Sequence, residues 1–193
     1  MSRPIPREKR KTRFLPAILS AFGLAFASHA TAGDRFFTAA LTKTTAITIG
    51  HSGPEWIEFF DPDCPFCHVL FDRLAPLAQT GKIRLRLIPV AVIDAQSLPR
   101  AVTLLSSPNP TQTLLTGERD FHNGHLAIRP ASGKLPAKPV QEIRENTRLL
   151  SAIDPDLLLP DLVFTNPAKT TTAQLQGVPS ETTLQRALSY SRK

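Results

Sequence analysis

The sequence predicts one α/β domain, and three observations lead to this class. Short apolar runs of strand character alternate along the chain with stretches in which leucines recur at helical spacing. The 193 residues, 41% hydrophobic and 20% charged, are enough for one domain with a sizeable core. Only two cysteines are present, which excludes a disulfide-dense miniprotein and a zinc ribbon. The composition also excludes disordered, collagen-like and coiled-coil chains.

The first half of the domain is expected to supply three strands. Residues 44–50 and 56–60 are rich in β-branched and aromatic side chains and are separated by a turn signal. Residues 82–93 begin with basic and apolar side chains in alternation and become continuously apolar, which predicts a strand that runs into the middle of a sheet. Pro89 lacks a donor for the ladder and therefore marks a bulge or the end of this strand.

A helix is expected over residues 64–79, between the second and the third strand, because leucines recur there at helical spacing. Asp61-Pro62-Asp63 can cap its start, since a carboxylate accepts hydrogen bonds from the unpaired N–H groups of the first turn. Pro76 is expected to kink the helix, and Gly81 is expected to end it.

The second half is expected to begin with a helical insert over residues 94–156. Short helical patterns occur within it at residues 98–105, 111–117 and 140–153. Two strands are predicted to follow, over residues 160–165 and 172–176. Ser180 is then expected to cap a last helix that ends near Tyr190, because its hydroxyl can accept from the first turn.

The positive charge of the chain is concentrated at its N-terminus. The net charge is +7 and the pI about 9.9, yet residues 1–32 alone hold six basic residues and one acid. An apolar run of 14 residues, Phe14–Ala27, and the small residues Ala30-Thr31-Ala32 complete the pattern of a secretory signal peptide. We expect cleavage after Ala32, export to the periplasm and a domain over residues 33–193. An uncleaved anchor is the alternative, although a membrane span needs roughly 20 residues.

The predicted mature chain is close to neutral. It carries 17 Lys and Arg against 15 Asp and Glu, a net charge of +2. It contains no basic block and no basic stripe interleaved with aromatic residues, so nucleic acid is not an expected partner. Export would place both cysteines in an oxidising compartment, where disulfides persist.

The two cysteines form the segment Cys64-Pro65-Phe66-Cys67, where a predicted strand gives way to a predicted helix. A helix N-terminus carries unpaired N–H groups and partial positive charge, which stabilise a thiolate. Cys64 gains most from this and is the predicted nucleophile, and Cys67 is close enough to form an intramolecular disulfide with it. Phe66 adds no charge, so we expect a milder oxidant than a histidine in that position would give.

Three other interpretations of the cysteine pair stay open. A structural disulfide would close such a small loop that it would add little stability. Covalent haem would use the C-x-x-C-H pattern that His68 completes, with a second axial ligand taken from His51, His122 or His125. Zinc would need the two cysteines together with His122 and His125.

The segment Phe60–His68, F-D-P-D-C-P-F-C-H, resembles the active-site segment of the bacterial periplasmic DsbC/DsbG family, which belongs to the thioredoxin superfamily. The apolar strand, the helical region, the segment Pro160–Phe164 and the segment Gly177–Pro179 follow in the family's order, so the similarity covers about residues 55–190. The resemblance implies a thioredoxin-like fold with a helical insert between the second core strand and the cis-proline strand.

The resemblance also implies an activity. The chain would be a thiol:disulfide oxidoreductase that acts on cysteine-containing envelope proteins and a membrane redox partner, without a cofactor or a metal. Pro160 matches the family's cis-proline, which faces the cysteine pair, and Leu159 and Phe66 would touch the bound substrate. Pro155 is the rival for the cis-proline because Asp-Pro-Asp also favours a turn. The direction of electron flow stays open, since it depends on the reduction potential.

Three features depart from the family's pattern. Only 31 residues, Gly33–Asp63, separate the predicted cleavage site from the first cysteine, which leaves no room for the family's dimerisation domain, so we expect a monomer. Glu58 lies where thioredoxin and DsbA have a buried acid. Both faces of its strand are apolar, so we expect it to be buried and to relay the proton of Cys67, with an outward orientation as the alternative. Leu159 and Asp161 are unusual beside the proline, which predicts a different substrate preference and leaves a binding module or chaperone with little redox turnover as the alternative function.

Overall fold

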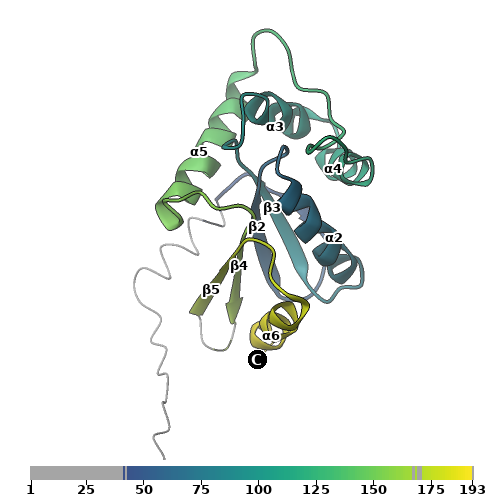
Figure 1. Ribbon diagram of the computed structural model, residues 1–193, viewed down its shortest axis with the longest axis vertical. Coiled ribbons are helices and arrows are strands. Elements are labelled where there is room, and N and C mark those ends of the chain that lie inside the picture. Colours follow the sequence, from purple (N-terminus) through teal and green to yellow (C-terminus); the bar gives the residue numbers. More distant parts are fainter. Residues whose placement is uncertain (1–40, 42, 167, 169–170, 193) are drawn as a thin grey trace, which may run out of the picture.

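The computed structural model describes residues 41, 43–166, 168 and 171–192, which form a five-stranded sheet with helices on both faces (Figure 1). The strands are β1 (Ile47–Ile49), β2 (Glu55–Phe60), β3 (Arg84–Pro89), β4 (Asp161–Asn166) and β5 (Thr171–Gln176). The helices are α2 (Pro65–Gln79), α3 (Ser97–Ser106), α4 (Pro110–Arg119), α5 (Ala137–Ile153) and α6 (Glu181–Ser191). None of these helices has the length and the apolar character that a membrane crossing requires. The predicted signal peptide lies outside the described residues.

The strand order of the sheet is β1-β3-β2-β4-β5, with β2 and β3 parallel and the other neighbours antiparallel. The five predicted strands are all present, although β1 is shorter than predicted. Pro89 marks the end of β3 and not a bulge within it. Because β2 is the central strand, its last residue, Phe60, leads the chain out of the middle of the sheet. The cysteine segment therefore begins at the centre of the molecule.

The residues of β2 divide between the two apolar layers that cover the sheet. Trp56 and Phe60 are buried with α2 and α6 on one face, and Ile57 and Phe59 are buried with α5 on the other. Strand alternation assigns Glu58 to the face of Trp56 and Phe60. This is also the face on which both cysteines are buried.

The start of α2 differs in one respect from the prediction. The N-cap is Cys64 itself, whose Sγ accepts a hydrogen bond from the Cys67 backbone N–H at 3.1 Å, and not a carboxylate of Asp61 or Asp63. Pro65 occupies the first turn, where its missing N–H leaves no partner unsatisfied. The helix continues through Pro76 to Gln79.

Three helices, α3, α4 and α5, occupy the region between β3 and β4. Figure 1 shows α3 and α4 beyond the end of the sheet at which α2 begins. The chain enters β4 through a cis peptide bond between Leu159 and Pro160, so the rival assignment of the cis bond to Pro155 is wrong. The last helix, α6, begins as predicted, with the Ser180 hydroxyl accepting from the Thr183 N–H at 3.2 Å.

Candidate active site

Both cysteines are buried at the start of α2 and are not joined by a disulfide in this structure. Cys64 is 3% exposed and Cys67 is 2% exposed. As the N-cap, Cys64 replaces the hydroxyl or carboxylate that usually accepts from the first turn of a helix, because its sulfur takes the hydrogen bond from the backbone of Cys67. The sulfur of Cys64, the predicted nucleophile, is therefore hydrogen-bonded directly to the first turn of the helix.

The surroundings separate the two thiols by acidity. A hydrogen bond from the thiol of Cys67 lowers the pKa of Cys64, and backbone hydrogen bonds from Cys67 and Phe66 lower it further against the opposing effect of burial. Burial raises the pKa of Cys67 well above its usual value, and the neighbouring Cys64 and Glu58 add to this rise. Cys64 is therefore the group that ionises first, and Cys67 keeps its proton until a base removes it.

Glu58 lies in the middle of β2 and is completely buried, which excludes the outward orientation. Neither of its carboxylate oxygens has a hydrogen-bond partner in the described part of the chain. Burial raises the pKa of Glu58 well above its usual value, and electrostatic interactions with Glu118 and Cys64 raise it further. A carboxyl group whose pKa is raised by burial keeps its proton to higher pH than an exposed one, and it can exchange that proton with a neighbouring thiol.

A second buried carboxyl reaches the site from α4. Glu118 is 5% exposed, and its Oε2 lies 2.7 Å from Nδ1 of His68, the residue after Cys67. The ring of His68 is stacked on Phe121, with 4.1 Å between the ring centroids. Burial raises the pKa of Glu118 to about 7, although the hydrogen bond and the electrostatic attraction of His68 lower it. Sequence analysis missed Glu118, because no spacing rule connects a residue of the helical region with residue 68.

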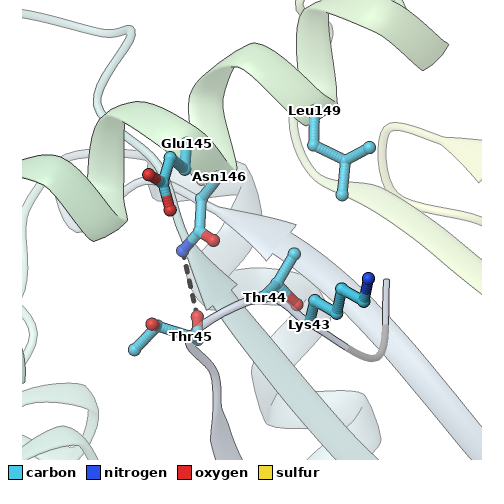
Figure 2. A pocket seen from close by; sticks show the side chains of 6 residues that line it. All are labelled: Lys43, Thr44, Thr45, Glu145, Asn146 and Leu149. Atoms are coloured by element: carbon cyan, nitrogen blue, oxygen red, sulfur yellow. Dashed lines mark hydrogen bonds between the residues drawn. The ribbon is translucent and has the colours of Figure 1, made fainter. Parts of the chain in front are cut away.

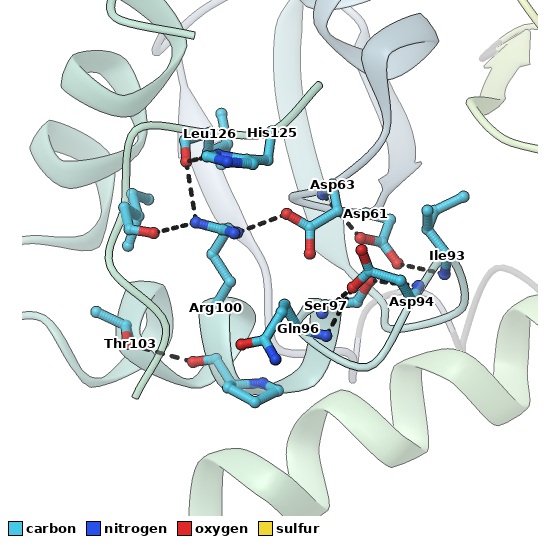
Figure 3. A network of polar contacts seen from close by, with 12 residues as sticks. Asp61, Asp63, Ile93, Asp94, Gln96, Ser97, Arg100, Thr103, His125 and Leu126 are labelled. Carbon is cyan, nitrogen blue, oxygen red and sulfur yellow. Dashed lines mark hydrogen bonds and ion pairs between the residues drawn. The ribbon is translucent and has the colours of Figure 1, made fainter. Parts of the chain in front are cut away.

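A network of polar contacts holds the residues that come just before Cys64 (Figure 3). Asp61 accepts hydrogen bonds from the backbone N–H groups of Asp63, Val92 and Ile93. Nε of Arg100 lies 2.5 Å from Oδ1 of Asp63, and both side chains are buried. This ion pair joins α3 to the residue immediately before Cys64. Burial raises the pKa of Asp63, and Arg100 opposes that rise.

The same arginine also orders the loop after α4. Nη1 of Arg100 donates to the carbonyl oxygens of Leu126 and Ile128, and the Leu126 N–H donates to the Pro62 carbonyl at 2.8 Å. The loop is therefore attached directly to the segment that carries the cysteines. Arg100 was also missed by sequence analysis, since nothing in the pattern of α3 predicts which buried position would carry a charge.

The residues predicted to touch substrate gather at the same end of the sheet. Register pairs Phe59 of β2 with Asp161 of β4, so Pro160 lies beside the last residue of β2. Leu159 is partly buried against the apolar layers on both faces. The large apolar side chains that the described structure leaves exposed all belong to segments at this end: Phe66, Val69, Ile93 and Leu158.

The residues of the zinc alternative are not brought together. His122 and His125 face each other across a tight turn at an isolated β-bridge, and the described residues contain no group of three or more His, Cys, Asp or Glu side chains able to hold a metal ion. His68, which the haem alternative needs as an iron ligand, is hydrogen-bonded to Glu118 and stacked on an aromatic ring.

Two pockets flank the helical region. One, of about 450 Å³, lies beside the network of Figure 3 and is lined by Arg100, His122, His125, Ala127, Ile128, Arg129 and Pro130. The other, of about 250 Å³, lies between α5 and the segment before β1 (Figure 2), and Asn146 donates to the Thr45 carbonyl at 3.0 Å in its wall. The second pocket has no thiol or imidazole in its lining, whereas two histidines line the first.

The cysteine pair at a helix start and the cis-proline at the entry to a neighbouring strand define a protein of thioredoxin-like fold. A periplasmic thioredoxin-like protein from Salmonella enterica serovar Typhimurium has a similar structure, with a TM-score of 0.64 and 18% identity over 81% of this chain and 95% of that chain. No family model matches the sequence.

Sequence comparison identifies nearer relatives. The chain is 28% identical over 121 residues to the thiol:disulfide interchange protein DsbG of Pseudomonas aeruginosa, covering 63% of this chain and 45% of that protein. It is 28% identical over 127 residues to DsbG of Escherichia coli, covering 65% and 49%. The chain thus spans about half the length of these curated relatives. It is similar in sequence to the DsbG proteins and has the fold of the thioredoxin-like proteins.

Proposed function

We propose that this protein is a thiol:disulfide oxidoreductase that exchanges disulfides with other proteins through Cys64 and Cys67. The observation that carries the proposal is the position of Cys64 as the N-cap of α2, where its sulfur accepts from the Cys67 backbone N–H at 3.1 Å. The opposite shifts of the two thiol pKa values, downward at Cys64 and upward at Cys67, agree with it. The sequence similarity to DsbG supports the same reaction class. A structural disulfide would need no such difference between its two thiols.

The proposed reaction has two exchange steps. The thiolate of Cys64 attacks one sulfur of a substrate disulfide, forms a mixed disulfide and releases the other substrate sulfur as a thiolate. The ionised form of Glu58 accepts the proton of Cys67, whose thiolate then attacks the sulfur of Cys64 and releases the second substrate thiolate. The substrate disulfide gains two electrons, and the protein ends with a Cys64–Cys67 disulfide. The reverse sequence oxidises a substrate, and the reduction potential decides the direction.

The proposed substrates are proteins, because the rim of the site is apolar and exposed. Phe66 is 63% exposed on the first turn of α2, and Leu158 is 51% exposed two residues before the cis-proline. An exposed apolar surface at this position suits a protein segment whose own core is incomplete. Pro160 and Leu159 are proposed to line the path of the bound segment.

The proposed setting is the bacterial envelope. Residues 1–32 would be removed as a signal peptide, and residues 33–193 would act in the periplasm as a monomer on cysteine-containing envelope proteins. A membrane redox partner would restore the starting state. Mass spectrometry of the protein recovered from the periplasm and sedimentation of the purified protein test the cleavage site and the oligomeric state.

Substitution of the nucleophile tests the activity. Cys64→Ser is expected to abolish insulin reduction by the purified mature protein and the oxidation of dithiol peptides. Cys67→Ala is expected to form mixed disulfides with envelope proteins that the protein cannot resolve. Ser151→Ala, an exposed change on α5 away from the cysteines, is a control that should retain exchange. Unchanged exchange in Cys64→Ser would contradict the proposal.

The exposed apolar rim also favours a second candidate, a thioredoxin-fold binding module or chaperone with little redox turnover. The Cys67→Ala variant separates the two candidates. Covalent complexes that a reductant dissociates support the oxidoreductase, whereas partners that are held without a disulfide support the module.

A further inference from the structure

The pocket of about 450 Å³ beside the network of Figure 3 is lined by basic side chains and by no acidic one. Its ionisable residues are Arg100, His122, His125 and Arg129, and its other lining residues are apolar. A hollow with cationic groups on its wall and no carboxylate favours a negatively charged ligand over a positively charged one.

Arg100 supplies a buried donor to this pocket. It is 5% exposed. Its Nε is paired with Asp63, and its Nη1 donates to the carbonyl oxygens of Leu126 and Ile128. Nη2 has no hydrogen-bond partner among the described residues. A guanidinium has more N–H groups than these contacts use, so the Nη2 edge of Arg100 is left for a ligand.

Arg129 supplies the charge that no carboxylate balances. Asp63 balances the charge of Arg100, whereas Arg129 is exposed and has no ion pair or hydrogen bond in the described part of the chain. Because Arg129 also lines the pocket, an oxyanion held there would gain a charge-assisted hydrogen bond from a guanidinium that is otherwise unpaired.

The two histidines of the pocket both leave Nε2 available. Nδ1 of His122 lies 2.7 Å from the Asp120 carbonyl oxygen, and Nδ1 of His125 lies 3.0 Å from the Leu126 carbonyl oxygen. A carbonyl only accepts, so each Nδ1 carries the hydrogen and each Nε2 is free to meet a ligand. The Leu126 carbonyl accepts from both His125 and Arg100 (Figure 3), which holds this imidazole beside the guanidinium.

We propose that this pocket binds an oxyanion, either a carboxylate or a phosphate. The Nη2 edge of Arg100 and the guanidinium of Arg129 donate to its oxygens, and Nε2–H of a protonated histidine adds a further donor. The volume lies within the range of about 300–1,000 Å³ that small-molecule sites have. The apolar wall, formed by Ala127, Ile128 and Pro130, suits the methylene groups of an acidic side chain. The pocket therefore has room for a free ion or for the glutamate or aspartate of a bound polypeptide.

A metal ion is the less suitable occupant of the same pocket. The described residues contain no group of three or more His, Cys, Asp or Glu side chains able to hold a metal. The other polar side chains that line the pocket are the two arginines, whose charge repels a cation.

Direct contacts connect the pocket with the cysteine segment. Arg100 pairs with Asp63, the residue before Cys64, and the Leu126 N–H donates to the Pro62 carbonyl at 2.8 Å. A polypeptide bound at the cysteines is therefore a nearby source of a carboxylate. This source rests on the proposed exchange activity, whereas binding of a free oxyanion does not.

An NMR titration of the imidazole groups of the mature protein tests the site without a redox reaction. Sodium phosphate and sodium succinate would be added at constant pH and ionic strength, with sodium chloride as the balancing salt. The signals of His122 and His125 should shift and saturate. The signal of His51, which follows Gly50 beside the C-terminal end of α2, should not.

Variants identify the group that binds the ion. Arg129→Gln removes the unpaired guanidinium and should weaken the binding of phosphate or succinate about tenfold. Arg144→Gln removes an exposed arginine of α5 that does not line the pocket, so it is the matched control and should bind as the wild type does.

Exchange with short peptides identifies the source of the oxyanion. Each peptide carries one cysteine in a mixed disulfide with thionitrobenzoate, so attack by Cys64 on the peptide sulfur releases the coloured thionitrobenzoate thiolate. The series places glutamate at successive positions on either side of the cysteine, and each peptide has a glutamine counterpart. If a substrate carboxylate occupies the pocket, one spacing should react about tenfold faster with glutamate than with glutamine. Arg129→Gln should remove this preference, and Arg144→Gln should keep it.

The outcomes keep the pocket and the exchange activity apart. Saturable imidazole shifts without a glutamate preference assign the pocket to a free oxyanion, and a glutamate preference that Arg129→Gln removes assigns it to a substrate. The proposal is wrong if neither is seen, if His51 shifts as much as His122 and His125, or if Arg129→Gln changes neither measurement. If no peptide releases thionitrobenzoate, the exchange activity fails, and the NMR titration alone decides whether the pocket binds an oxyanion.

Discussion

Two groups of buried acids flank the cysteine pair, and they differ in the hydrogen-bond and ion-pair partners that the rest of the chain gives them. Of the outer acids, Asp61 accepts from three backbone N–H groups, whereas Asp63 is paired with Arg100 through one oxygen and its other oxygen has no partner among the described residues. Of the inner acids, Glu118 is hydrogen-bonded to His68, and Glu58 has no hydrogen-bond partner among the described residues. Asp61 and Asp63 come shortly before Cys64 in the chain. The charge of Glu58 acts on Cys67, and Glu118 bonds the residue that follows Cys67.

This difference suggests two roles for buried acids at one site. An acid with partners holds its surroundings in place, and an acid without partners can take part in proton transfer. A charge that is hydrogen-bonded or paired with an opposite charge holds its surroundings in place. A buried carboxyl without partners costs free energy when it is ionised, so it keeps its proton to higher pH than an exposed one. Asp61 and the Asp63–Arg100 ion pair therefore hold the cysteine segment in position, and proton transfer is proposed for Glu58 among the inner acids.

The largest expected effect comes from breaking the ion pair of the outer acids. Arg100→Met leaves Asp63 buried without its cation, which should lower the free energy of unfolding by about 3–5 kcal/mol. Urea unfolding followed by Trp56 fluorescence would measure it. Arg84→Met is the matched control, because Arg84 pairs with Glu55 in a more exposed place and its loss should cost about 1 kcal/mol or less. Equal losses in the two variants would mean that burial of the Arg100 pair is not what stabilises the segment.

The inner acids predict the opposite kind of effect, which depends on pH. Folded Glu58 keeps its proton above its ordinary pKa of 4.5, where the unfolded chain has already lost it. The contribution of this group to stability therefore falls as pH rises above about 4.5, by up to about 1.4 kcal/mol per pH unit, until the raised folded pKa is reached. Glu58→Gln should be relatively more stable than the wild type at neutral pH than at pH 5.

Unfolding free energies at several pH values between about 5 and 8 would measure the difference between the two proteins. Glu145→Gln removes an exposed carboxyl and should leave the slope of the wild type unchanged. If the stability difference between Glu58→Gln and the wild type were the same at every pH, Glu58 would be ionised in the folded protein.

Much of the fold, but only part of the site, could be predicted from the sequence. Local patterns located the strands, the helix after the cysteines and the Ser180 cap, because each depends on a short stretch of chain. The resemblance to the DsbC/DsbG family, and not a local pattern, assigned the cis-proline to Pro160. Alternation within β2 predicted the burial of Glu58. Glu118 and Arg100 could not be predicted in the same way, since their positions beside the cysteines depend on how α3 and α4 pack against the end of the sheet. The N-cap of α2 was predicted to be a carboxylate of Asp61 or Asp63, although the sulfur of Cys64 has that role.

A smaller effect is expected at Asp61, where the hydrogen bonds are to backbone groups. Asp61→Asn keeps one acceptor oxygen but turns an amide NH₂ toward N–H groups that have lost their acceptor. Leaving a buried N–H without a partner costs about 1–3 kcal/mol, so a loss of this size in urea unfolding is expected. Asp156→Asn, in the turn before the cis-proline and exposed, is the control and should be nearly neutral. No loss in Asp61→Asn would show that the N–H groups of Val92 and Ile93 find other acceptors.

The smallest expected effect concerns Asp161, which is intermediate between the two groups. It is buried where β4 begins, one oxygen accepts from Nε2 of Gln174 at 2.6 Å, and the other oxygen has no partner among the described residues. Burial raises the pKa of Asp161 to about 6, against the hydrogen bond from Gln174, which lowers it. Gln174→Ala should therefore raise this pKa further, which carbon-detected NMR titration of the carboxyl would show.

The stability of Gln174→Ala follows from the sign of that shift. Because the folded pKa lies above the unfolded one, ionisation of Asp161 lowers stability as pH rises from about 4 through 6, and the variant extends this loss to higher pH. The variant should match the wild type most closely near pH 4 and be less stable by about 1 kcal/mol at pH 8. Gln176→Ala, an exposed change on the same strand, should show no such pH dependence. A single hydrogen bond to one oxygen would then be enough to lower the pKa of a buried acid. An unchanged Asp161 titration in Gln174→Ala would contradict this explanation.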